Sequence, residues 1–154
     1  MLGSLKAFIS GIVADAGLQS ENKNRRIATA ALLIRVASVS GEMSQPRRVK
    51  LHVVLKSCFG LDDISAAELI DDATAADRSA VDLYHFTRQL NGFLDDEWCR
   101  RIVKMMWEVV YADEVVNELE SNVIWRAADL LGVTSRQRIE LRRIAADRAA
   151  LAPT

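Results

Sequence analysis

The segment from Ile27 to Val39 constrains the fold more than any other part of the chain. Only Thr29, Arg35 and Ser38 are polar among these 13 residues, so a helix here is apolar on almost every side. The segment is well short of the ~20 apolar residues that a membrane-spanning helix needs. It is therefore predicted to be a helix in the middle of a soluble core.

Helix signals continue along the whole chain. Ser44 is a typical N-cap and Pro46 suits a first helical turn, while capping boxes occur at Ser65–Glu68, Asn117–Glu120 and Thr134–Gln137. No run alternates between polar and apolar residues, so strands are not expected. The sequence predicts an all-α fold, a single compact bundle of seven to eight helices in one domain over residues 1–154. The predicted helices cover residues 2–15, 22–40, 44–60, 65–76, 79–90, 95–110, 117–132 and 134–150.

The two halves of the chain share one plan, which predicts a weak internal duplication. Residues 26–61 and 101–133 each contain an apolar helix, a small turn, a capped helix and a glycine. In this alignment the turn Ser40–Ser44 lies opposite the turn Asp113–Asn117.

Composition restricts the class of partner and the compartment. The net charge is −1, so no overall field favours nucleic acid or an acidic membrane. Cys58 and Cys99 lie within apolar helical patterns and are interpreted as buried thiols in a reducing compartment. The start of the chain has Lys6 inside its apolar segment and lacks a cleavage site, so no signal peptide is predicted. A cytoplasmic location is expected.

The clearest cluster of carboxylates follows the helix predicted to end near residue 110. Asp113, Glu114, Asn117, Glu118 and Glu120 could supply oxygen ligands to Ca²⁺ or Mg²⁺. Their spacing is not that of an EF-hand, because the 12-residue loop with its central glycine is absent. The alternative is a helix N-terminus where acids favour the dipole and the Asn117–Glu120 box caps the first turn.

This turn also carries a resemblance to a known family. Ala112, Asp113, Val116, Asn117 and Glu120 match a recurring pattern of the TerB family: Ala-Asp-Gly at a helix end, an aliphatic residue, a cap and then glutamate. The chain departs from the pattern at Glu114, which replaces the glycine. In the first half Gly41, Met43 and Ser44 fit, whereas Ser40 replaces the aspartate and Arg47 the glutamate.

The resemblance spans roughly residues 24–131 and implies more than the residues show alone. TerB proteins are small, all-helical and associated with tellurite resistance, and a related domain occurs in some membrane-tethered J-domain cochaperones. The resemblance implies a role in the response to metal oxyanions, a divalent cation at Asp113, Glu114, Asn117 and Glu120, and membrane-associated protein partners. The missing acids in the first turn speak against a paired cation site.

Other candidate residues favour structure over catalysis. His52 and His85 lie on separate predicted helices without a local partner, and no nucleophile motif occurs, so the chain is not expected to be an enzyme. Trp98, Trp107 and Trp125 could line a ligand pocket, but their helical spacing favours a place in the core.

The sequence therefore predicts a non-enzymatic binding or scaffolding module of a tellurite or metal-oxyanion stress response that senses a divalent cation at residues 113–120. The alternative is a metal-independent interaction domain that works through the basic C-terminal helix or the apolar N-terminal helix. Acids interleaved among the arginines of the C-terminal helix instead favour a salt-bridged, solvated face. A protein partner is expected, with no certain cofactor and no nucleic acid, and a homo-oligomer remains open.

Overall fold

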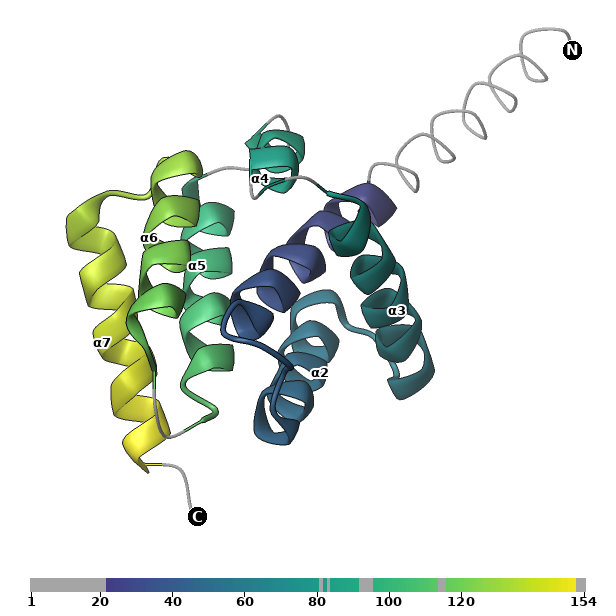
Figure 1. The fold of residues 1–154 in the computed structure, drawn as a ribbon, viewed down its shortest axis with the longest axis horizontal. Coiled ribbons are helices and arrows are strands. Elements are labelled where there is room, and N and C mark those ends of the chain that lie inside the picture. The colour runs from purple at the N-terminus through teal and green to yellow at the C-terminus, as the bar shows by residue number, and fades with distance from the viewer. Residues whose placement is uncertain (1–21, 81, 83, 92–95, 114–115, 152–154) are drawn as a thin grey trace, which may run out of the picture.

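Every described element of the structure, a computed structural model, is a helix (Figure 1). The structure describes residues 22–80, 82, 84–91, 96–113 and 116–151. The prediction of an all-α bundle is confirmed, while the helix predicted over residues 2–15 lies outside the described residues. The first described helix covers residues 22–38, followed by α2 (Gln45–Phe59), α3 (Asp63–Ser79), α4 (Tyr84–Asn91), α5 (Asp96–Val110), α6 (Glu118–Leu130) and α7 (Ser135–Leu151).

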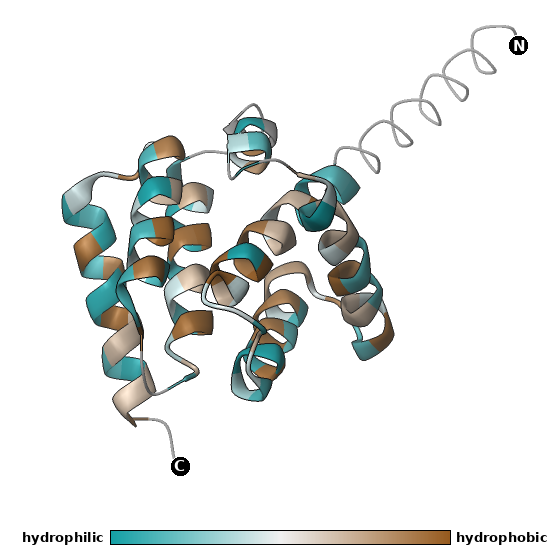
Figure 2. Cartoon of the chain, viewed as in Figure 1, coloured by the Kyte–Doolittle hydropathy of each residue, from teal (hydrophilic) through white to brown (hydrophobic). Residues whose placement is uncertain are grey.

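The core is built around the helix over residues 22–38 and α5. Residues 28–34 of the first helix are all buried, including Thr29, as its nearly uniform apolar sequence predicts. α5 buries eight residues and packs against α2, α6 and α7. Figure 2 shows that hydrophobic and hydrophilic residues are interspersed along the helices, and the buried residues are mostly hydrophobic. None of the described helices combines the length and the apolarity needed to cross a membrane.

The structure contains the two corresponding halves that the sequence plan indicates. The helix over residues 22–38, α2 and α3 form one half, and α5, α6 and α7 form the other in the same order. A glycine in the left-handed conformation also follows the second helix of each half, Gly60 (φ 63°) after α2 and Gly132 (φ 76°) after α6. α4 lies between the halves in the sequence and contacts α6.

The boundaries of the middle helices differ from the prediction. α3 begins at Asp63, because the Asp62 carboxylate accepts a hydrogen bond from the Ser65 N–H at 2.7 Å and caps the helix earlier than the predicted Ser65 box. The helix then continues to Ser79, across the break predicted between residues 76 and 79, since no glycine or proline interrupts it.

One tryptophan and one cysteine are more exposed than the sequence predicts. Trp107 is buried, but Trp125 is 55% exposed, so the prediction of a core position is wrong for Trp125. Cys99 is buried as expected, whereas Cys58 is only half-buried. The Cys58 pKa is raised, because burial outweighs the nearby charges of Arg101, Arg25 and Arg26, so the thiol stays protonated.

Candidate functional site

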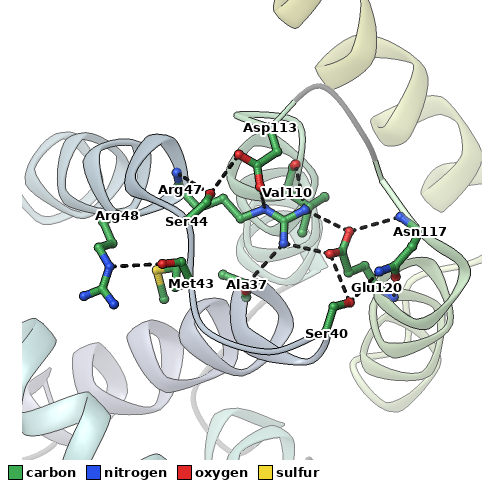
Figure 3. A network of polar contacts seen from close by, with 10 residues as sticks. All are labelled: Ala37, Ser40, Met43, Ser44, Arg47, Arg48, Val110, Asp113, Asn117 and Glu120. Carbon is green, nitrogen blue, oxygen red and sulfur yellow. Dashed lines mark hydrogen bonds and ion pairs between the residues drawn. The ribbon is translucent and has the colours of Figure 1, made fainter.

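A buried ion pair joins the two halves of the molecule (Figure 3). Arg47 lies in the first turn of α2 and Glu120 in the first turn of α6, and the two residues are 4% and 3% exposed. Arg47 Nη1 donates to Glu120 Oε1 at 2.7 Å and Nη2 donates to Oε2 at 2.8 Å. This bidentate arrangement is the strongest pairing that the two side chains can form.

The Arg47 guanidinium also donates hydrogen bonds to carbonyls at the C-terminal ends of the two core helices. Nη1 donates to the Ala37 carbonyl at 3.3 Å and Nη2 to the Val110 carbonyl at 3.1 Å. Both carbonyls belong to last helical turns, where backbone acceptors lack a partner and the helix dipole favours a positive charge. Arg47 Nε lies at ion-pair distance, 3.2 Å, from Asp113 Oδ2. One side chain thus gathers two helix ends and two carboxylates.

Hydroxyl and amide groups complete the network around the ion pair. The Ser44 hydroxyl donates to Asp113 Oδ1 at 2.8 Å, the Ser40 hydroxyl donates to Glu120 Oε1 at 3.2 Å, and Asn117 Nδ2 donates to the Ser40 hydroxyl at 2.5 Å. The predicted Asn117–Glu120 capping box is confirmed, because each side chain accepts a hydrogen bond from the other residue's backbone N–H. The carboxylate of Glu120 therefore caps a helix and binds Arg47 at once.

The two halves make equivalent contacts with each other, as two subunits related by a two-fold axis do. Arg47 and Glu120 stand 73 positions apart, and the same offset relates Ser40 to Asp113 and Ser44 to Asn117. The Ser44–Asp113 and Asn117–Ser40 hydrogen bonds are thus the same contact made twice, once from each half. Because Arg47 and Glu120 are counterparts of each other at this offset, a two-fold relation between the halves would place their ion pair on its axis.

Glu120 remains ionised within this buried network. Burial alone would raise its pKa, but the Arg47 hydrogen bonds, the Asn117 N–H, the Arg47 charge and the Ser40 hydroxyl together lower the pKa below the ordinary value of 4.5. The negative charge on Glu120 is thus part of the folded state at neutral pH.

The structure describes three of the four residues predicted to bind a divalent cation. Asp113 and Glu120 direct oxygens to Arg47, and the Asn117 side-chain oxygen accepts the Glu120 N–H at 2.9 Å. Glu114 lies outside the described residues, so the four-residue cation site stays a prediction. Within the described part of the chain, no three His, Cys, Asp or Glu side chains gather so that they could hold a metal ion.

Sequence reasoning did not identify Arg47, Ser40 and Ser44 as partners of the acidic turn. Their contacts with it span 69 to 80 positions, which no local pattern reveals. One signal was available, because Arg47 and Ser40 are the positions at which the first half departs from the acidic residues of the second. Opposite charges at two such positions can pair when the fold brings the positions together, as it does here.

The histidines do not form a closed catalytic arrangement. His52 Nε2 lies 3.3 Å from Asp63 Oδ1, but that aspartate side chain is 78% exposed and its same oxygen binds Lys56. His85 is exposed, and its ring packs edge-on against the ring of Phe86, which is the buried residue of the two. His52 also lines a cavity of about 450 Å³ together with Glu42 and Asp77, although its side-chain contact is with the exposed Asp63.

The arginines of α7 are largely occupied within the protein. Arg143 pairs with Glu140 and Asp147, Arg142 donates to the Tyr111 hydroxyl and stacks on Trp107, and Arg138 stacks on Trp125. This face matches the salt-bridged alternative of the sequence analysis better than a free basic patch.

Comparison with known proteins matches residues 26–143 to the model of a family described as tellurite resistance protein TerB. The match covers the span from the first core helix into α7 and includes both halves of the network. Searches of curated proteins and of solved structures give no match.

The lowered pKa of Glu120 predicts how stability depends on pH. Because Glu120 is a stronger acid in the folded state, its contribution is present above the unfolded pKa of about 4.5 and disappears as the pH falls through the folded value. At pH 7, Glu120→Gln should lower the free energy of unfolding by about 3 kcal/mol, since Arg47 loses its buried charged partner. The urea-unfolding curves of wild type and variant should converge as the pH falls below about 4.5 and through the lower folded pKa of Glu120.

Glu97→Gln is the control for this experiment. Glu97 is an exposed glutamate in the first turn of α5 and forms no ion pair with another described residue. Its variant should follow the acid dependence of the wild type. A constant difference between wild type and Glu120→Gln from pH 7 to pH 3 would contradict the charged state of Glu120.

Proposed function

Because the chain belongs to the TerB family of tellurite resistance proteins, we propose that it is a non-enzymatic scaffolding module in the response to tellurite and related metal oxyanions. In this proposal Arg47 holds the acidic turn closed, and the module works through protein contacts without a divalent cation at residues 113–120. The observation that carries the proposal is the buried guanidinium between Asp113 and Glu120.

Electrostatics explains why the arginine can act in place of a metal ion. If both halves carried the family glutamate, two carboxylates would meet near the approximate axis, and their repulsion would call for a cation between them. Arg47 supplies a permanent positive charge at that place, attached to α2. It also donates to two helix-end carbonyls, which a metal ion bound by carboxylates does not need to reach.

A divalent cation would have to compete with this arrangement. Ca²⁺ takes six to eight oxygen ligands. The described acidic turn offers the carboxylates of Asp113 and Glu120, which already face Arg47, and the exposed carboxylate of Glu118. Displacing the guanidinium would leave a buried charge without its partner, at a cost of about 3–5 kcal/mol. The predicted cation sensor is therefore the weaker form of the proposal, and the metal-independent interaction domain is the stronger.

The non-enzymatic part of the proposal is supported by the surroundings of the histidines. The Asp63 carboxylate that faces His52 is largely exposed and also binds Lys56, so the pair lies in an open setting. The arginines of α7 do not favour a scaffold that works through a free basic surface, because Arg138, Arg142 and Arg143 already bind within the chain.

Isothermal titration tests the metal-independent proposal. Ca²⁺, Mg²⁺, Mn²⁺ and Zn²⁺ titrated into the wild type should give either no binding heat or a heat that Asp113→Ala leaves unchanged. The reason is that the Asp113 carboxylate already binds Arg47 and Ser44. The midpoint of thermal unfolding should be the same in EDTA and in each cation. Saturable heat in the wild type that disappears in Asp113→Ala would instead establish the cation sensor.

Growth in tellurite tests the cellular role. Deletion of the gene should lower tolerance to tellurite, and the wild-type copy should restore it. His52→Ala and Asp63→Ala should restore it equally well, because neither residue belongs to the Arg47 network. Full tolerance after deletion would contradict the role in tellurite resistance, while loss of tolerance in a well-folded His52→Ala variant would contradict the non-enzymatic proposal.

A further inference from the structure

The outer face of α6 carries apolar side chains that the fold leaves uncovered. α6 buries Glu120, Ile124, Ala127 and Ala128 toward the core. Leu119 and Trp125 point outward instead and are 58% and 55% exposed. With the polar residues between and beside them they form one stripe, called here the α6 stripe: Glu118, Leu119, Asn122, Trp125 and Arg126.

A groove runs alongside the α6 stripe. It has a volume of about 860 Å³ and lies between α6, the end of the first core helix and the end of α3. Val39 and the Arg35–Asp77 ion pair line the wall opposite Leu119 and Trp125. The α6 side of the groove combines the apolar Leu119, Val123 and Trp125 with the polar Asn122, Arg126 and Asp129, and the far wall carries the Arg35–Asp77 ion pair.

The charges of the α6 stripe lack partners within the described chain. Glu118 and Arg126 form no ion pair with another described residue, in contrast to Arg35, Arg47 and Arg143 elsewhere. They stand eight positions apart, too far along one helix to bind each other. A surface that keeps an acid, a base and two large apolar side chains exposed on one stripe is typical of an interface.

The order of residues in the stripe makes it complementary to itself. Glu118 and Arg126 are each four positions from Asn122, and Leu119 and Trp125 are each three positions from it. When two such helices lie antiparallel with a two-fold axis at Asn122, each acid meets a base and each leucine meets a tryptophan. The two asparagines meet on the axis, where their amides can donate to and accept from each other.

We propose that two copies of this chain associate through the α6 stripe, in antiparallel orientation about Asn122. The interface contains two Glu118–Arg126 ion pairs and two Leu119–Trp125 contacts, and Trp125 of each copy extends toward the groove of the other. Arg138, which stacks on one side of Trp125, holds the indole in place for this contact. The proposal does not depend on the role in tellurite resistance.

Charge reversal followed by mixing tests this interface by analytical ultracentrifugation of the full chain. The wild type should show a concentration-dependent monomer–dimer equilibrium. Glu118→Arg alone places arginine opposite arginine, and Arg126→Glu alone places glutamate opposite glutamate, so each should raise the dissociation constant at least about tenfold. An equimolar mixture should restore the dimer, because every cross-copy pair is then an acid facing a base.

Two controls separate the interface from effects on folding. Arg136→Glu reverses an exposed charge on α7 and should leave the dissociation constant unchanged. Circular dichroism should show that both reversal variants keep the helical fold, since neither residue has a described ionic partner to lose. Asn122→Cys should form a disulfide between two copies under mild oxidation, because the axis brings the two positions together.

The possible results are decisive. A wild type that stays monomeric at high concentration overturns the proposal, whether the stripe is then covered by a different protein or by residues 1–21 of the same chain. A dimer that neither reversal weakens, or a mixture that fails to restore association, overturns it as well. Restoration by mixing supports it, because no change within a single copy can produce that result.

Discussion

The ion pair between Arg47 and Glu120 is the interaction on which the rest of the structure depends. Removing two charges from water is costly, and a buried pair recovers that cost only when its geometry is good and its remaining polar atoms are satisfied. Here the pair is bidentate, and the guanidinium also binds the carbonyls of Ala37 and Val110. The pair therefore specifies where the ends of the two core helices meet, a position that nonpolar packing alone would leave free to slide.

The approximate two-fold relation explains why an arginine stands at this position. The offset of 73 residues makes Arg47 the counterpart of Glu120, so whatever residue occupies position 47 faces Glu120 near the axis. Two glutamates there would repel each other. An arginine at position 47 replaces that repulsion with a buried bidentate ion pair, beside which the matching hydrogen bonds of Ser44 and Asn117 are formed. In the structure, the Asp113 and Glu120 carboxylates of this turn both face Arg47.

Local patterns predicted the parts of the structure that depend on local physics. The apolar sequence of residues 27–39 indicated a buried core helix, and the Asn117–Glu120 box indicated the start of α6, because both depend on residues within a few positions. The start of α3 was predicted two residues late, since Asp62 rather than Ser65 caps the helix, and the break predicted between residues 76 and 79 does not occur. The partners of the acidic turn could not be predicted from spacing, because they come from the other half of the chain. Only the comparison of the halves contained that information.

The most direct measurement is the urea-unfolding free energy of Arg47→Glu, Glu120→Arg and the double variant. Each single change places like charges near the axis and should cost at least about 3–5 kcal/mol. If the halves are equivalent about the pair, exchanging its members rebuilds it, because the new carboxylate can cap α2 together with Ser44 and the new guanidinium on α6 can reach both helix-end carbonyls. The double variant should then recover at least half of the combined loss. A double variant that loses as much as the two single variants together would contradict the account.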